Sequence, residues 1–99
     1  MASIADKLRE ARALIERGWT RGTLERDGRV CAVGAISKAL TGDASRGLYA
    51  EGAPPVAFAV EDVVGAHGWL GDWNDKQKSK KSVLAAFDKA IELAEADNA

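Results

Sequence analysis

The chain has 99 residues, of which 46% are hydrophobic and 29% charged, a balance typical of a folded domain and not of a disordered chain. Fourteen Lys and Arg residues against fifteen Asp and Glu residues give a formal net charge of −1, which excludes a global positive field that would drive binding to nucleic acid or anionic lipid. A length of 99 residues is typical of one domain, which we expect over residues 1–99. One cysteine and one histidine are too few for a disulfide framework or a structural zinc site, so we expect a cytoplasmic protein without metal or cofactor.

The first predicted element is an amphipathic helix over residues 3–17. Ser3 and Asp6 have the spacing of a capping box, and Gly18 is expected to end the helix in the left-handed conformation, with Trp19 packed back onto it. Charges from Asp6 onward interrupt any N-terminal apolar run, so we expect neither a signal peptide nor a membrane span. The apolar residues recur at spacings of three and four: Ile4, Leu8, Ala11, Leu14 and Ile15.

A short β-hairpin and a buried helix are predicted next. The pair Asp27-Gly28 tolerates positive φ and favours a tight turn within residues 20–30. Residues 30–40 are small and apolar on most sides, as in a central helix. Gly34 inside that helix costs about 1 kcal/mol relative to alanine, which indicates that another backbone packs closely against it.

The middle of the chain is predicted to form a loop followed by a third helix. Gly42 should end the preceding helix, and residues 41–53 have no steady period, so we expect a loop anchored by Leu48 and Tyr49. A third helix should begin at the adjacent prolines and run to about residue 67, because proline fits a first helical turn. Its apolar stripe consists of Val56, Val60, Val63 and Val64.

Residues 69–75 are predicted to form an ordered loop, because two tryptophans in so short a segment are rarely left in water. Ser79 should cap a fourth helix that frays from Glu95 onward. The fold class expected is therefore mainly α, a compact four-helix domain with a short β-hairpin between helices 1 and 2. The buried face of the last helix should contain Val83, Leu84, Phe87, Ile91 and Ala94.

Aromatic and polar residues follow the predicted helix ends and could meet on one side of the molecule. They are Trp19, His67, Trp69, Trp73, Asn74 and Asp75. Tryptophans beside convergent polar groups can form a protein-binding hot spot. Alternatively, the tryptophans close helix ends, and Asn74 and Asp75 hold the loop through side-chain to backbone hydrogen bonds.

A basic run precedes the last helix, which ends in acidic residues. Lysines at a helix N-terminus oppose the helix dipole, so this arrangement is either a solvated face or a site for nucleic acid or another anion. The basic residues are Lys76, Lys78, Lys80 and Lys81.

Cys31 lies near a predicted helix N-terminus, where backbone amides lower the pKa of a thiol, and His67 could serve as its base. The alternative is a buried cysteine that acts as a small hydrophobe. Glu61 and Asp62 have the spacing of surface carboxylates, so we do not expect them to work as a paired acid and base.

Through three short sequence motifs, the chain resembles a family of small uncharacterised proteins of actinobacteria and their phages. These motifs are Gly-Trp-Thr from residue 18, Cys-x-x-Gly-Ala from residue 31 and Trp-Asn-Asp from residue 73, and the resemblance extends from residue 11 to about residue 94. It implies no established activity, and the lysine-rich segment before Ser79 departs from the pattern. The residues that match are Trp19, Cys31, Gly34, Trp73, Asn74 and Asp75.

These observations predict a non-enzymatic protein-binding module, a monomer or homodimer, whose partner is another protein. The resemblance favours a phage-encoded modulator of a host protein. One alternative is a nucleic-acid accessory protein that uses Lys76 to Lys81, and a second is a small cysteine-dependent enzyme.

Overall fold

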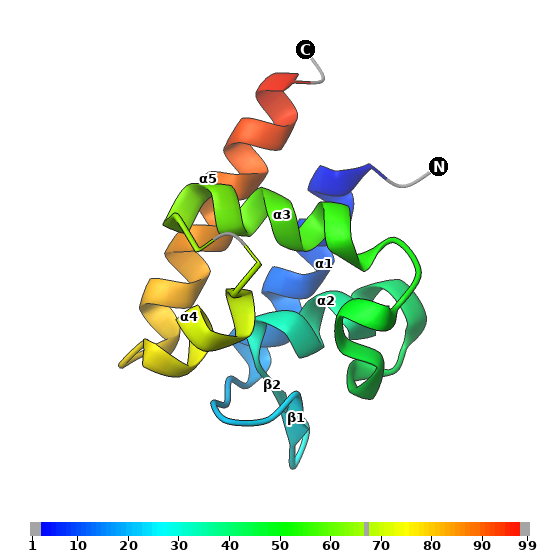
Figure 1. The fold of residues 1–99 in the computed structure, drawn as a ribbon, viewed down its shortest axis with the longest axis vertical. Helices are drawn as coiled ribbons and strands as arrows, with labels where there is room; N and C mark the ends of the chain where they lie inside the picture. Colours follow the sequence, from blue (N-terminus) through cyan, green and yellow to red (C-terminus); the bar gives the residue numbers. More distant parts are fainter. Residues whose placement is uncertain (1–2, 67, 98–99) are drawn as a thin grey trace.

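The computed structural model describes residues 3–66 and 68–97, and its helices and short hairpin are shown in Figure 1. In chain order the elements are α1 (Ile4–Arg17), β1 (Glu25–Arg26), β2 (Arg29–Val30), α2 (Ala32–Thr41), the 3-10 helix η1 (Ala44–Tyr49), α3 (Ala53–Val64), α4 (Leu70–Lys76) and α5 (Lys80–Asp97). The mainly helical fold with a hairpin between the first two helices is confirmed. The predicted count of four helices is wrong, because η1 and α4 form where loops were expected.

The two ends of α1 differ in how well the sequence predicted them. The capping box is present, since the Asp6 amide donates to Ser3 Oγ at 3.1 Å and the Ser3 amide donates to Asp6 Oδ2 at 3.3 Å. The left-handed cap at Gly18 was wrong, because Gly18 is extended, with φ −178° and ψ 129°. The chain leaves α1 directly into pairing with β2, where the Val30 amide donates to the Gly18 carbonyl at 3.0 Å.

The hairpin and the glycine of α2 follow the sequence predictions. Strands β1 and β2 pair antiparallel around Asp27 and Gly28, which both have positive φ, 51° and 80°. A Cβ built on Gly34 would lie 2.1 Å from the carbonyl oxygen of Leu24. A backbone does pack closely against α2, and only a glycine leaves room for it.

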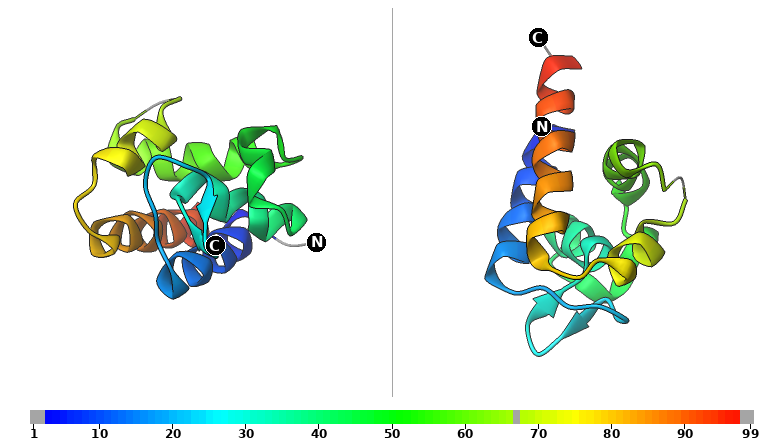
Figure 2. Two further views of the ribbon diagram at one scale, coloured as in Figure 1. Left: turned by 90° about the horizontal axis from the view of Figure 1, so that it is seen from below. Right: turned by 90° about the vertical axis from the view of Figure 1, so that its left-hand side faces the viewer.

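Helices α1 and α5 lie side by side and run in opposite directions, as both views in Figure 2 show, while α3 lies against them and α2 occupies the centre. The first six residues of α2 are all buried. Phe87 of α5 is the largest fully buried side chain. Helices α1, α3 and α5 therefore enclose one core around α2.

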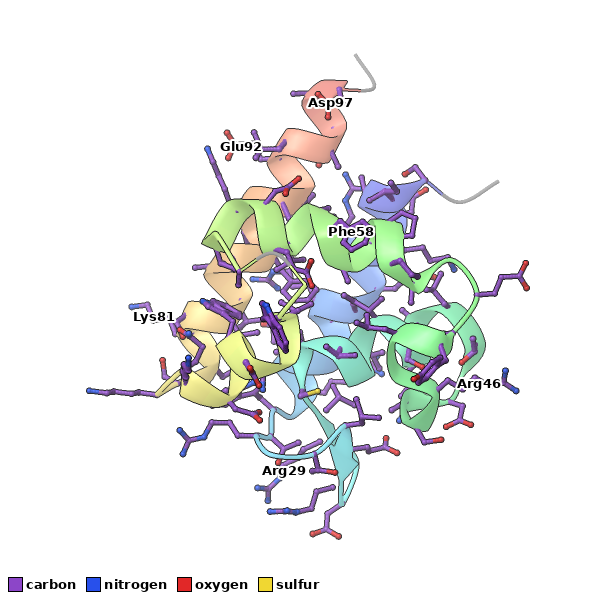
Figure 3. All side chains as sticks on the ribbon, in the orientation of Figure 1. Arg29, Arg46, Phe58, Lys81, Glu92 and Asp97 are labelled. Carbon is purple, nitrogen blue, oxygen red and sulfur yellow. The ribbon has the colours of Figure 1, made fainter. Side chains whose placement is uncertain are left out.

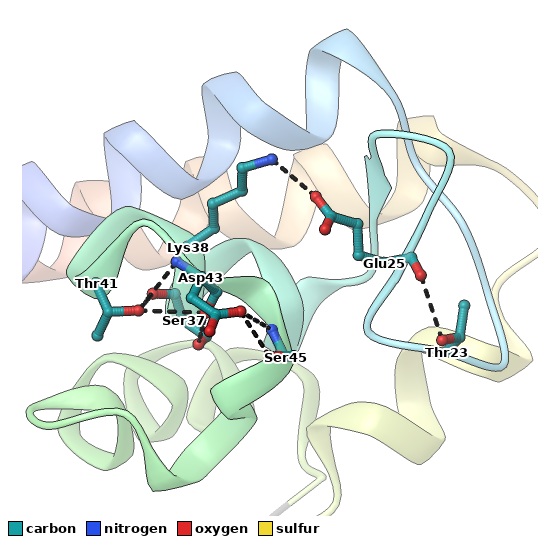
Figure 4. Close-up of polar contacts among 7 residues, drawn as sticks. All are labelled: Thr23, Glu25, Ser37, Lys38, Thr41, Asp43 and Ser45. Carbon is teal, nitrogen blue, oxygen red and sulfur yellow. Dashed lines mark hydrogen bonds and ion pairs between the residues drawn. The ribbon is translucent and has the colours of Figure 1, made fainter.

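Polar contacts fix the end of α2 and the start of η1 (Figure 4). Gly42 ends α2 in the left-handed conformation, as predicted. The Ser37 hydroxyl donates to the Asp43 carbonyl at 2.6 Å, and the Asp43 carboxylate accepts from the amide and hydroxyl of Ser45 at 2.9 and 2.6 Å. The Ser45 hydrogen bonds lower the pKa of the Asp43 carboxyl group. These bonds start a helical turn that the residue pattern did not reveal.

The anchors predicted for this segment are wrong. Tyr49 is 99% exposed and Leu48 is 39% exposed, whereas Ala44 and Gly47 of η1 are buried. Gly47 has φ 55° and kinks η1, and its backbone approaches the side chain of Leu24. The small residues, and not the large ones, therefore hold η1 against the core.

The second half of the chain differs from the prediction mainly at its helix ends. Both prolines lie in the first turn of α3 as expected, but α3 ends at Val64, with Gly65 as its C-cap, and not near residue 67. The loop predicted over residues 69–75 is helix α4, and Trp69, which was expected to avoid water, is exposed. Helix α5 begins directly after Ser79 and continues to Asp97, past the predicted start of fraying at Glu95.

Candidate functional site

Asn74 of α4 is fully buried and connects several parts of the fold. Its Oδ1 accepts from Trp19 Nε1 at 2.8 Å and from the Ala32 amide at 3.0 Å. Its Nδ2 donates to the Thr20 carbonyl at 3.2 Å and to Asp75 Oδ1 at 3.3 Å. These four bonds use both donors and both acceptor sites of the side-chain amide. Asn74 therefore fastens α4 to the segment between α1 and α2.

Asp75 and its neighbours form a second connection between the same segments. Asp75 Oδ1 accepts from the Gly22 amide at 2.8 Å. Arg21 donates to the Gln77 carbonyl at 2.9 Å, and its guanidinium lies 5.9 Å from the centre of the Trp19 ring. The side-chain to backbone bonding considered for Asn74 and Asp75 is thus present, although α4 replaces the expected loop.

The three tryptophans have different surroundings. Trp19 and Trp73 are partly buried against the core, whereas Trp69 is 67% exposed. Trp69 and Trp73 border a hollow of about 460 Å³ that is also lined by Val64, Gly65, Ala66, Asp72 and Lys76. His67, which was expected to lie near them, is outside the described residues. The structure therefore joins Trp19, Asn74 and Asp75 in one network, and Trp69 is the most exposed of the three tryptophans.

Cys31 is the N-cap of α2, and its Sγ accepts from the Gly34 amide at 3.3 Å. The side chain is buried, and this desolvation raises the pKa of the thiol. Asp72 and Asp75 line the small hollow of about 320 Å³ beside it. The proposed base, His67, lies outside the described residues. This environment favours the protonated thiol over the thiolate nucleophile.

We therefore expect Cys31 to resist alkylation in the folded protein. At neutral pH, iodoacetamide should modify it at least about tenfold more slowly than a free thiol, because a raised pKa lowers the thiolate fraction and burial blocks access. Intact-mass spectrometry with and without denaturant provides the measurement. Rapid modification of the native protein would show that the thiol is accessible and would revive the cysteine-enzyme alternative.

The four lysines of the basic run are exposed and come from two helices and the connection between them. Lys76 is the last residue of α4, Lys78 lies in the connection, and Lys80 and Lys81 begin α5. Lys80 Nζ donates to the Glu16 carbonyl at 2.8 Å. The run therefore lies beside the C-terminal end of α1.

Glu61 was predicted to be a surface carboxylate, and this is wrong. It is buried in α3, where Oε1 accepts from the Gly68 amide at 2.9 Å and Oε2 from the Leu70 amide at 3.3 Å. The carboxylate thereby holds the connection between α3 and α4. A signal was available, because Ala57 and Val64 lie four residues before and three residues after it on the same helical face.

An apolar groove between three helices was not predicted. Ile4 of α1, Phe58 of α3 and Leu93 of α5 are 41%, 53% and 46% exposed. They line a hollow of about 520 Å³, and Asp62 and Asp97 line it as well. Figure 3 shows Phe58 on α3 and Asp97 at the far end of α5. Large apolar side chains that converge in this way are typical of an interaction surface. The remaining lining residues are Ser3, Pro55, Ala59, Ala90 and Ala94.

Comparison with known proteins identifies the family of the chain. No helix in the described ranges has both the length and the apolar character needed to span a membrane. No curated protein and no solved structure matches the chain. The profile of a family of unknown function (DUF6197) matches residues 1–93, and the chain therefore belongs to that family.

Proposed function

We propose that the protein is a non-enzymatic protein-binding module and that the apolar groove between α1, α3 and α5 is its contact surface. The observation that carries the proposal is the convergence of Ile4, Phe58 and Leu93 on one hollow. Interfaces concentrate their binding energy in such apolar, desolvated centres. The capping box of α1 and the close packing of α1 against α5 keep the groove in place, which reduces the entropy lost on binding.

The partner should be an apolar helical segment flanked by Lys or Arg. Asp97 lines the groove at the end of α5, and no basic residue in the described ranges lines it. A symmetric dimer through this surface would bring the acidic residues of two copies together, so a different protein fits better. The resemblance to actinobacterial and phage proteins supports a host protein in the cytoplasm as this partner.

Site-specific photo-crosslinking tests the proposal. A photoreactive phenylalanine analogue placed at Leu93 should capture a defined partner from a lysate of the source cell. The same analogue at Tyr49, which is almost fully exposed and away from the groove, is the matched control. Placement at Trp69 tests the surface predicted from the sequence.

Competition decides whether the captured protein occupies the groove. Unlabelled wild-type protein should abolish capture at Leu93. A folded Phe58→Ser variant should compete at least about tenfold less well, because a central aromatic residue contributes about 2 kcal/mol or more to binding at an interface. Equal capture at Leu93 and Tyr49 would overturn the proposed groove. Capture at Trp69 alone would move the surface to α4.

A further inference from the structure

The basic residues of the chain fall into two groups that differ in their partners. Six of the fourteen form ion pairs with carboxylates: Lys7, Arg9, Arg12, Lys38, Arg46 and Lys89. Within residues 3–66 and 68–97, the other eight form no such pair: Arg17, Arg21, Arg26, Arg29, Lys76, Lys78, Lys80 and Lys81. All eight are exposed. Their charges are therefore available to a ligand.

These eight residues come from three segments, 17–21, 26–29 and 76–81, which the fold brings together. Arg21 and Lys80 reach across to the Gln77 and Glu16 carbonyls. The hairpin lies against the end of α1 through the bond from Val30 to Gly18 and the approach of the Arg29 side chain to Gly18. Figure 3 shows Arg29 at the opposite end of the molecule from Asp97. We call this surface the basic face.

The basic face breaks two local rules. Arg26 and Arg29 are direct partners across the hairpin, where like charges are destabilising. Lys80 and Lys81 occupy the first turn of α5, where the helix dipole disfavours cations. No ion pair within the described residues offsets either cost, which is expected where charge serves binding.

We infer that the basic face binds the phosphate backbone of nucleic acid. Contacts to phosphate need exposed Arg and Lys side chains and no apolar centre. The exposed large apolar residues of the described chain all lie outside the three segments, whereas a protein interface has an apolar core. Asp27 is the one acidic residue in these segments, and it occupies the hairpin turn. The basic face is a different surface from the groove, and it binds nucleic acid without regard to base sequence.

Fluorescence anisotropy with a short labelled DNA duplex of mixed sequence tests the inference. Wild-type protein should bind with an affinity that falls steeply as salt rises, because each phosphate contact contributes about 0.9 to the slope of log K against log salt. The triple variant Arg26→Gln, Lys78→Gln, Lys81→Gln should reduce the magnitude of that slope by about three, since each substitution removes about one phosphate contact. These three side chains make no hydrogen bond or ion pair within the described residues, so the variant should fold.

A charge-matched control separates the basic face from net charge. The variant Arg9→Gln, Arg46→Gln, Lys89→Gln removes the same charge elsewhere and should keep the wild-type slope. Phe58→Ser should also bind DNA normally, which distinguishes this inference from the groove. If unlabelled single-stranded DNA or duplex RNA displaces the labelled duplex, the feature recognised is the phosphate backbone that all nucleic acids share. Equal slopes for the two triple variants, or equal displacement by polyglutamate and unlabelled duplex at equal charge, would overturn the inference.

Discussion

Replacement of Gly34 with alanine should lower the free energy of unfolding by about 3 kcal/mol or more. The new Cβ would lie 2.1 Å from the Leu24 carbonyl oxygen and 2.9 Å from the carbonyl carbon. A backbone carbonyl cannot rotate away as a side chain can, and this one also accepts from the Cys31 amide at 3.2 Å. The loss should appear as a fall in Tm of roughly 12–24 °C, measured by circular dichroism.

Gly71 provides the matched control for this substitution. It also lies in a helix, but a Cβ there would meet Val33 at 3.9 Å, an ordinary contact distance. Gly71→Ala should therefore leave stability unchanged or raise it by up to about 1 kcal/mol, since alanine favours the helix. Similar Tm values for the Gly34 and Gly71 variants would contradict the close approach of Leu24.

The variant Asn74→Leu should also lose about 3 kcal/mol or more of unfolding free energy. Leucine fills a similar volume but leaves Trp19 Nε1, the Ala32 amide and the Thr20 carbonyl without their hydrogen-bond partner. Each buried polar group that loses its partner costs about 1–3 kcal/mol. Urea unfolding followed by tryptophan fluorescence measures the loss.

Asp75→Asn is the control at the neighbouring position. It keeps an oxygen that can accept from the Gly22 amide, and its side chain is exposed, so the loss should be about 1 kcal/mol or less. If Asn74→Leu unfolded at the wild-type urea concentration, the network would contribute nothing to stability, and Asn74 would have to be retained for another reason.

Signals confined to a few neighbouring residues predicted the fold well where they were present. The capping box at Ser3 and the Asp27-Gly28 turn depend on local geometry, and both were found. A glycine inside a helix also signalled the close approach at Gly34, although the backbone that approaches belongs to Leu24. Helix α4 was missed because its seven residues are too few for a periodic pattern. Its helical state depends on contacts made by Leu70 and Asn74, which are both buried.

The candidate sites depended on contacts between distant residues, and the sequence could nominate members but not partners. Asn74 and Trp19 were grouped correctly, yet their bond joins positions 55 residues apart. The basic run was identified without the arginines that join it, because only the fold places Arg29 at the same end. The groove could not be predicted from the sequence, because the outward-facing residues of the three helices converge only once the helices have packed.

The Asn74 network also has a consequence for the order of folding. Three of its partners lie 42 to 55 residues earlier in the chain, so closing this contact carries the entropy cost of a long loop. Helices α1 and α2 are neighbours in sequence and can assemble before that cost is met. We therefore expect α4 and the segment from Trp19 to Ala32 to dock after α1 and α2 have assembled, and to open together in the native state.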